Sequence, residues 1–521
     1  MDITSPNSLW KDYDPAALPL NTSFLSEKTE NDVKIKDLYF DGYTTVDGRV
    51  RAYVKISEHS DAKGVILYLA NDEGGYDDEL VTTLYGYGYT VAVLDYLGKS
   101  DKYSRYTLYP VSLDKCNCRG LKEFTVEDDA QYSNWYIWVC MARRAALLLK
   151  HLYGTDIFAL GVGLGGDTVY KLASFEDEFK ACATLLNIIP AVTGDGNHII
   201  NYHASLDNTA YATLCKAPLF MAFPSNAEDG SFDDMSELAN STASLKRLRI
   251  VQRAFICGIN AVYPEIDRFF DQIDTDIMIS PHITASNSEG NLYMNIGIAN
   301  AVAEAEYKIK LYVSFCIAEA PFRNWMCIPT ISLGGEVFMA PVNVCDAEKP
   351  IYAFANIIDG NNNISSSPVL SIIPKTLGLK ARPGVSHRKI YDGSMGEDGW
   401  TSRDGGTVKT IKGPFGIDGI TCDSHSIITL KLGDPLFKVP ADTLLQLMLC
   451  GKPQTVNISV RDKTTVYSCP VQINTTDDWQ SFSLSHINFK SQNGPLFDWS
   501  QILMLEFTFE DEFIIGSVLW V

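Results

Sequence analysis

The first half of the chain alternates uninterrupted apolar runs with amphipathic stretches. The runs occupy residues 64–70, 90–96, 156–162, 181–188, 218–223 and 253–259, and such runs are typical of strands buried on both faces of a parallel sheet. Residues 33–40 and 49–56 instead alternate apolar and polar positions, which predicts an antiparallel pair. The clearest helix, predicted over 126–154, has an acidic start, one apolar face and a closing glycine.

Helical patterns are missing from the rest of the chain. Strand-like runs separated by glycine and asparagine turns fill residues 278–376, which predicts an immunoglobulin-like β-sandwich. A second series of longer strand-like runs fills residues 377–521 and ends on a strand, which favours a jelly roll. The sequence therefore predicts a multidomain protein, with an α/β domain over 1–277 followed by two all-β sandwich domains.

The apolar run 156–162 leads through a glycine-rich turn into a helical pattern. Gly161, Gly163 and Gly166 match the G-x-G-x-x-G spacing of a dinucleotide-binding loop, which needs an acidic residue about 20 positions later, at the end of the next strand. The next strand ends with Asn187 instead. A dinucleotide site would therefore lack the carboxylate that holds the ribose.

The charge balance excludes some classes of partner. The 521 residues include 43 Lys and Arg against 64 Asp and Glu, a formal net charge of −21, and such a surface repels nucleic acid phosphates and anionic lipid headgroups. No apolar stretch approaches the roughly 18 residues of a membrane helix, and residues 1–15 lack the pattern of a secretory signal. We expect no nucleic acid or membrane partner and a cytoplasmic protein, or a secreted one if a signal has been removed.

The 12 cysteines lie mostly within apolar runs, as at Cys140, Cys182 and Cys450. This placement is typical of small buried hydrophobic residues and not of a disulfide framework, so it favours a reducing compartment. The close pair Cys116 and Cys118 has no second pair at ligand spacing. We therefore expect no zinc site, no other metal and no cofactor.

Three stretches of the first domain resemble α/β-hydrolases. Residues 88–100 resemble a strand and following loop of that superfamily, and residues 41–56 resemble the start of its acetyl xylan esterase and cephalosporin-C deacetylase branch. Residues 161–166 align with the G-x-S-x-G-G elbow of the same branch. The resemblance covers residues 33–277 and implies a mostly parallel sheet with flanking helices and an esterase site at the elbow.

The residues that this resemblance assigns to catalysis are altered. Gly163 stands where the family has its serine nucleophile. The loop after the fifth apolar run offers Glu228 or Asp229 as the acid, and Asn260 follows the sixth run where the histidine is expected. Glycine offers no nucleophile and a neutral amide is no general base near neutral pH, so the resemblance implies a degenerate catalytic triad.

Further candidate ligand-binding residues surround the elbow. Asn71 and Asp72 begin the loop in which hydrolases place one oxyanion donor, and Leu164 carries the backbone N–H that follows the elbow. His198 and His203 lie in a polar insertion between the fourth and fifth apolar runs, which we expect to form a cap over the sheet. Their spacing of five residues is poor for a shared metal ion.

The last domain resembles the galactose-binding-like modules of polysaccharide-active enzymes. Trp400 has polar, turn-forming neighbours and is the candidate platform for a sugar ring. Trp479, Trp499 and Trp520 lie in strand-like contexts, which favours core or edge packing. The expected ligand is a carbohydrate or a small acylated molecule.

Three functions are compatible with these patterns. The first is non-catalytic recognition, which the loss of both serine and histidine favours. The second is an active carbohydrate esterase that uses a non-standard group near His198 or His203. The third is a purely structural or interaction module. The side chains above Gly163 discriminate among these functions.

Overall fold

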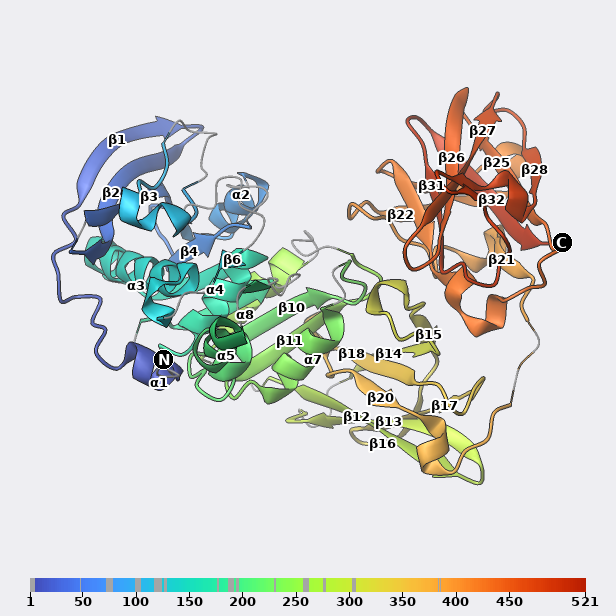
Figure 1. Ribbon diagram of the computed structural model, residues 1–521, viewed down its shortest axis with the longest axis horizontal. Coiled ribbons are helices and arrows are strands. Elements are labelled where there is room, and N and C mark those ends of the chain that lie inside the picture. Colours follow the sequence, from blue (N-terminus) through green and yellow to red (C-terminus); the bar gives the residue numbers. More distant parts are fainter. Residues whose placement is uncertain are drawn as a thin grey trace.

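A nine-stranded sheet organises the first part of the chain in the computed structural model (Figure 1). The structure describes all residues except 1–4, 47, 72–77, 99–104, 117–123, 126–128, 176–177, 186–191, 194–195, 229–230, 256–261, 275–277, 302–305, 383 and 385. The strand order is β1-β2-β3-β5-β4-β7-β8-β10-β11. These strands are β1 (Ser23–Glu30), β2 (Val33–Thr45), β3 (Gly48–Glu58), β4 (Val65–Leu69), β5 (Thr90–Asp95), β7 (Ile157–Val162), β8 (Ala181–Leu185), β10 (Leu219–Pro224) and β11 (Leu245–Val251).

The direction of the strands follows the pattern of the sequence. The N-terminal strands, whose polar and apolar residues alternate, pair antiparallel from β1 to β2, β3 and β5. The strands made of apolar runs, β5, β4, β7, β8 and β10, pair parallel, and β11 continues this pairing beside β10. Both faces of these parallel strands are buried because helices cover each side.

Helices cover the two faces of the sheet in two groups. One hydrophobic core includes α3 (Asn134–Tyr153), α4 (Leu164–Leu172), α7 (Phe232–Ser241) and the short helices α1 (Pro6–Trp10), α5 (Gly196–Ser205) and α6 (Asn208–Tyr211). The core on the other face includes α2 (Asp78–Gly86) and α8 (Tyr263–Gln272). The mixed sheet, its two helical layers and the sharp turn between β7 and α4 confirm the predicted α/β-hydrolase fold. Residues 5–274 are called the α/β unit below.

A two-sheet sandwich follows and is called the first β-unit (residues 280–372). One sheet has the order β12-β13-β17-β16, and the other has the order β15-β14-β18-β19 with β20 paired to β18. One hydrophobic core includes residues from both sheets. The strands are β12 (Ser280–Ser288), β13 (Asn291–Ala299), β14 (Lys308–Phe315), β15 (Met326–Ile328), β16 (Ile331–Gly334), β17 (Val337–Val342), β18 (Ile351–Ile358), β19 (Ile364–Ser366) and β20 (Leu370–Ile372).

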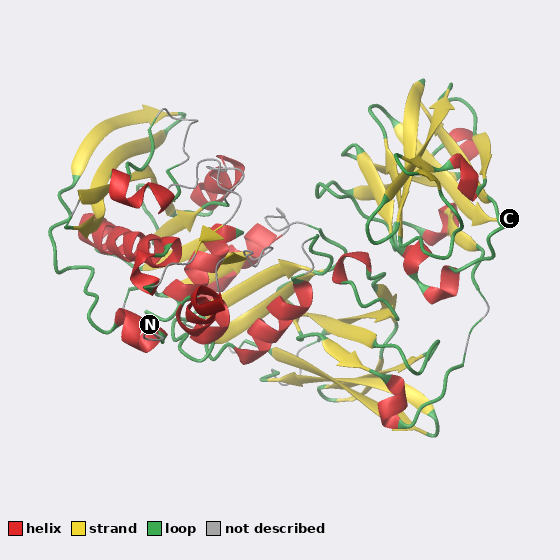
Figure 2. Cartoon of the chain, viewed as in Figure 1, coloured by secondary structure: helices red, strands yellow, loops and turns green. Residues whose placement is uncertain are grey.

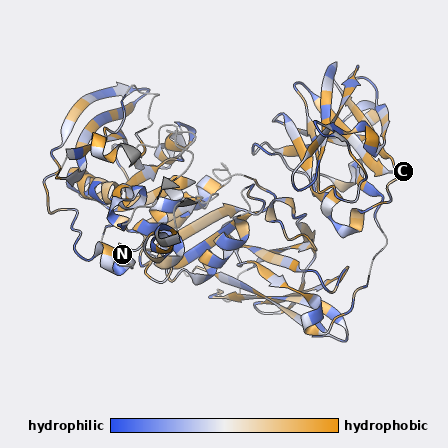
Figure 3. Ribbon diagram, viewed as in Figure 1, coloured by the Kyte–Doolittle hydropathy of each residue, from blue (hydrophilic) through white to orange (hydrophobic). Residues whose placement is uncertain are grey.

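A second sandwich, the second β-unit (residues 389–520), packs two six-stranded sheets around another core. The long helices belong to the α/β unit (Figure 2), and hydrophobic and hydrophilic residues alternate along the strands of the β-units (Figure 3). The strands are β21 (Lys389–Asp392), β22 (Val408–Lys412), β23 (Asp418–Cys422), β24 (Ser426–Thr429), β25 (Leu445–Gly451), β26 (Gln454–Arg461), β27 (Val466–Ile473), β28 (Gln480–Leu484), β29 (Lys490–Ser491), β30 (Gly494–Pro495), β31 (Met504–Thr508) and β32 (Phe513–Trp520).

The last strand of the α/β sheet is not the one that the sequence predicts. The apolar run 253–259 was expected to form it, but β11 precedes that run and contains Arg247 and Arg249. Both arginines are buried, 3% and 5% exposed, and Arg249 donates to Glu265 of α8 at 3.0 Å. The sequence pattern missed β11 because its buried arginines, one of them paired with Glu265, interrupt the apolar run.

The longest helix also begins later than predicted. α3 starts at Asn134, where the Ser133 side chain accepts a hydrogen bond from the Tyr136 backbone N–H at 3.3 Å. Its predicted end is confirmed, because Gly154 adopts a left-handed φ of 64° and its N–H returns to the Lys150 carbonyl. None of the described helices is long and apolar enough to cross a membrane.

Candidate functional site

The elbow between β7 and α4 has the backbone of a nucleophile turn. Gly163 has φ 55° and ψ −119°, a conformation that only glycine adopts without strain. The adjoining glycines are required by close packing, since an added Cβ would lie 2.2 Å from the Gly165 carbonyl oxygen at Gly161 and 2.1 Å from the Leu69 carbonyl oxygen at Gly165. Strand-to-helix contact therefore explains these glycines without a bound phosphate.

The first backbone donor after the elbow already has an acceptor. The Leu164 N–H donates to the side-chain oxygen of Asn71, with an N···O distance of 3.4 Å. An oxyanion hole works by directing such an N–H at the oxygen that becomes charged in the transition state. The structure thus brings together two of the predicted site residues, Asn71 and Leu164. Asp72, predicted beside them, lies outside the described residues.

Among the described residues, no acid and histidine lie together at the positions predicted for the catalytic acid and base. Glu228 forms an ion pair with Arg403 of the second β-unit, which directs its carboxylate to that unit. Asp229 and Asn260 lie outside the described residues. Because β11 ends at Val251 and no histidine occurs between residues 203 and 282, the loop after this strand contains no imidazole whatever its conformation.

The cap predicted from the polar insertion contains α5 and α6. His203 Nδ1 lies 2.6 Å from Asp207 Oδ2, and the His203 side chain is 61% exposed. Asp207 also accepts the Thr209 N–H at 2.9 Å and so caps α6. His198 lies on α5. Among the residues that the structure describes, no His, Cys, Asp or Glu cluster has the make-up of a metal site.

A cavity of about 440 Å³ opens between the start of α4, the cap and α7. Burial, together with the nearby Asp167 and Asp207 charges, raises the pKa of the Tyr202 phenol well above its usual value. This phenol therefore stays neutral in the wall of an otherwise acidic cavity. The lining residues are Asp167, Tyr202, His203, Asp207, Asn208, Thr209, Asp234, Met235, Glu237, Leu238 and Ser241.

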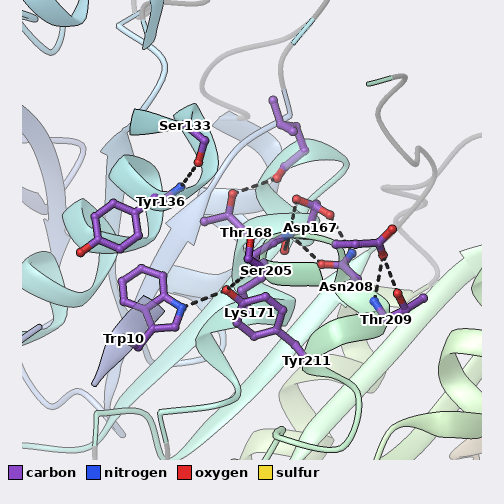
Figure 4. Close-up of polar contacts among 12 residues, drawn as sticks. Trp10, Ser133, Tyr136, Asp167, Thr168, Lys171, Ser205, Asn208, Thr209 and Tyr211 are labelled. Carbon is purple, nitrogen blue, oxygen red and sulfur yellow. Dashed lines mark hydrogen bonds and ion pairs between the residues drawn. The ribbon is translucent and has the colours of Figure 1, made fainter. Parts of the chain in front are cut away.

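A buried polar network fixes the inner wall of this cavity (Figure 4). Lys171 donates to Asp167 Oδ2 at 2.8 Å and to the Asn208 side-chain oxygen at 2.7 Å, and the Asn208 amide donates to Asp167 Oδ1 at 2.6 Å. Asp167 and Lys171 are 2% and 0% exposed. The network links the first turns of α4 to α6 of the cap, one helical turn beyond the elbow.

The tryptophan predicted as a sugar platform is a core residue. Trp400 is 4% exposed and packs edge-on against Tyr391, with ring centroids 5.6 Å apart. Its neighbour Thr401 pairs with Ile428 in a β-bridge, which holds this polar segment against the sandwich. The prediction that Trp400 stacks on a sugar is therefore wrong. Trp499 and Trp520, 2% and 4% exposed, have the core positions that their strand contexts predict.

The chain is similar in structure to several solved hydrolases. An acetyl xylan esterase from Paenibacillus sp. R4 is 15% identical, with 49% of this chain and 90% of that chain covered and a TM-score of 0.37. Acetyl xylan esterase 1 from Thermoanaerobacterium sp. JW/SL YS485 is 13% identical, with 48% and 88% covered and a TM-score of 0.36. A dienelactone hydrolase from Anabaena variabilis ATCC 29413 is 13% identical, with 48% and 96% covered and a TM-score of 0.29. The sequence matches no protein-family model and no curated protein.

Proposed function

We propose that the α/β unit is a catalytically degenerate, esterase-like hydrolase that binds a ligand without turning it over. One observation carries this proposal: the apex of the elbow is Gly163, and the adjoining Leu164 N–H is engaged by Asn71. Hydrolysis at an elbow needs a hydroxyl at the apex and an N–H directed at the developing oxyanion. Loss of the serine alone costs a factor on the order of 10⁶ in rate in the best-studied serine hydrolase.

The cavity between α4, the cap and α7 is the proposed ligand site. Its carboxylates disfavour anionic ligands, while the polar groups of Asn208 and Thr209 suit the hydroxyl groups of a sugar. Met235 and Leu238 offer an apolar surface for an acyl group or for the ring face. We therefore propose a neutral, sugar-derived and acylated ligand.

Binding and turnover of acetylated oligosaccharides test this proposal together. Ser241→Trp places an indole at the rim of the cavity, and Asn240→Trp, on the same helix but outside that cavity, is the matched control. We expect calorimetric binding by the wild type and by Asn240→Trp, weakened at least tenfold in Ser241→Trp. If the wild type hydrolyses p-nitrophenyl acetate and Ser241→Trp does not, the proposed lack of catalysis is contradicted. A complete lack of binding across acetylated and deacetylated oligosaccharides would contradict the recognition role.

A second candidate function is hydrolysis by a water molecule that His203 activates. The 2.6 Å contact with Asp207 favours it, because a proton held on Nδ1 by a carboxylate leaves Nε2 as a base at the cavity. This function predicts slow ester turnover that disappears in His203→Gln and persists in Gly163→Ala. Equal rates in His203→Gln and the wild type would exclude it.

A further inference from the structure

The loop that follows β10 is held by the first β-unit. Asn226 is fully buried, and its side-chain amide donates to the backbone carbonyls of Ala320, Pro321 and Arg323 at 3.2, 3.3 and 2.9 Å. In α/β-hydrolases the catalytic acid comes from the chain after the corresponding strand. Here a neutral amide at that place binds a neighbouring unit.

Arg323 closes the same contact from the other side. Its side chain is fully buried, and the guanidinium donates to both carboxylate oxygens of Asp233 on α7, at 2.5 and 2.6 Å. The central carbon of the guanidinium, Cζ, lies 3.5 Å from the centre of the Tyr352 ring. A buried, bidentate arginine with a stacked aromatic ring fixes both distance and orientation between two units.

The loop that follows β11 contacts both β-units. The Arg253 side chain donates twice to the Trp325 carbonyl, at 3.0 and 2.7 Å, and pairs with Asp398 of the second β-unit at 2.7 Å. The Arg253 carbonyl accepts the Thr401 hydroxyl at 2.8 Å. Arg253 has a φ of 58°, a left-handed conformation that is strained for a residue other than glycine. The contacts of all three units meet at this strained residue.

An apolar cluster lies at the same junction and has members from each unit. It consists of Phe255 of the α/β unit, Ile317 and Phe322 of the first β-unit, and Ile428, Leu430 and Met504 of the second β-unit. The two β-units also contact each other directly, since the buried Asn324 amide donates to the buried Asp434 at 3.0 Å. Figure 1 shows the α/β unit on the left, the first β-unit at lower right and the second β-unit at upper right.

We propose that the loops after β10 and β11, which carry the acid and the histidine in α/β-hydrolases, are the docking surface for both β-units, so that the three units fold and move as one body. Units joined only by small polar contacts move relative to one another. Here the buried Arg323 guanidinium, the buried Asn226 amide and a shared apolar cluster oppose that motion. The β-units are thus structural parts of the molecule and not independently tethered modules.

Variants of the full-length chain test this proposal by calorimetry and small-angle X-ray scattering. Arg253→Ala removes the side-chain contacts to Trp325 and Asp398, one in each β-unit, and Thr401→Ala removes the single bond to the Arg253 carbonyl as a milder variant. Lys375→Ala is the control, since its exposed ion pair joins the segment just after the first β-unit to Glu348 of that unit and involves neither of the other two units. We expect one heat-absorption peak for the wild type and for Lys375→Ala. We expect a second peak and a larger radius of gyration for Arg253→Ala, with a smaller shift for Thr401→Ala.

Separate unfolding peaks in the wild type would overturn the proposal. It would also be overturned if Arg253→Ala kept one peak and the radius of gyration of the wild type. If Arg253→Ala does not fold, Thr401→Ala decides. The proposal then requires that Thr401→Ala lower the unfolding temperature more than Lys375→Ala does, and it is overturned otherwise. Ligand binding and ester turnover do not enter these measurements, so their outcome is independent of the proposed function.

Discussion

At the scale of single residues, the elbow between β7 and α4 combines a left-handed backbone turn with a glycine at its apex. The glycine spacing predicted this turn correctly, because φ 55° with ψ −119° at Gly163 is open to glycine at little cost. A non-glycine residue in such a region stores roughly 1–3 kcal/mol of strain. Glycine at this position therefore avoids a strain that a serine would bear, and it offers no nucleophile.

Gly163→Ser tests this exchange. We expect a free energy of unfolding lower by about 1–3 kcal/mol, because the new Cβ must adopt the strained conformation, and no gain in p-nitrophenyl acetate hydrolysis, because Asn71 still occupies the Leu164 N–H. Chemical denaturation and an esterase assay provide the two readouts. Gly86→Ser is the control, since Gly86 is exposed and an added Cβ there meets no atom within 4 Å. Esterase activity appearing in Gly163→Ser would show that a base stands opposite the elbow.

Lys431 gives a pH-dependent prediction at the same scale. Burial lowers its pKa from 10.5 to about 8, and its ammonium group donates to the Ile390 carbonyl at 3.0 Å. Below pH 8 the lysine is charged in both the folded and the unfolded state, so folding bears the full cost of about 3 kcal/mol. That cost falls as the pH rises from about 8 to 10.5, because the folded protein releases its proton first.

Lys431→Met should therefore change stability in a pH-dependent way. We expect the difference in unfolding temperature between Lys431→Met and the wild type to favour the variant most near pH 7 and to shrink by pH 10. Thermal unfolding followed by circular dichroism at both pH values measures it. Lys409→Met, at an exposed position of β22, is the control and should show no such pH trend. A difference that grows with pH would contradict the depressed pKa.

At the scale of elements, the cap is attached to the α/β unit from two directions. Asn208 of α6 joins the buried pair of Asp167 and Lys171 on α4. Tyr211, also on α6, accepts a hydrogen bond from the Trp10 indole of α1 at 2.9 Å. The sequence shows the four-residue spacing of Asp167 and Lys171, but spacing does not reveal burial. The structure shows that this pair lies beneath the cap and is not solvated.

Removing one member of this buried pair should be costly. Lys171→Met leaves the Asp167 carboxylate uncompensated, and breaking such a pair typically lowers the free energy of unfolding by about 3–5 kcal/mol. Lys28→Met, which breaks the exposed pair with Glu30 in β1, should cost less than about 1 kcal/mol. The double change Asp167→Leu with Lys171→Met should recover part of the loss. Urea denaturation of the four proteins tests this order, and equal losses for both single variants would contradict it.

Prediction of elements succeeded where the local pattern is apolar and failed where buried charge replaces it. The apolar runs located β4, β5, β7, β8 and β10, because a strand covered on both faces has few polar side chains. β11 was not predicted because it contains Arg247 and Arg249, whose charged groups are buried. Their hydrogen-bond partners come from the first β-unit and from α8. Trp400 was misjudged for the opposite reason, since its ring packs in the core although its neighbours Thr401 and Ser402 are polar; the Thr401 hydroxyl donates to the Arg253 carbonyl.

At the scale of the whole molecule, the sequence predicted the three units but not the surfaces where they meet. Periodicity reports the environment along one segment, whereas contacts such as Asn226 with residues 320–323 join segments far apart in the chain. The same limit applies to the candidate site. Asn71 and Leu164 were predicted together from the known geometry of an elbow. The cavity under the cap depends on α7 and on Asp207, which no motif singled out.

The net charge gives a prediction for the whole molecule. With 64 acidic against 43 basic residues, exposed carboxylates repel one another in the folded protein, and salt screens that repulsion. Exposed ion pairs oppose this trend, but each contributes only about 0–1 kcal/mol.

Raising NaCl from about 0.01 M to about 0.15 M shortens the screening length from about 30 Å to about 8 Å, so the unfolding temperature should rise. A neutral osmolyte at equal osmolarity is the control. An unfolding temperature that falls with salt would mean that exposed ion pairs outweigh the net repulsion.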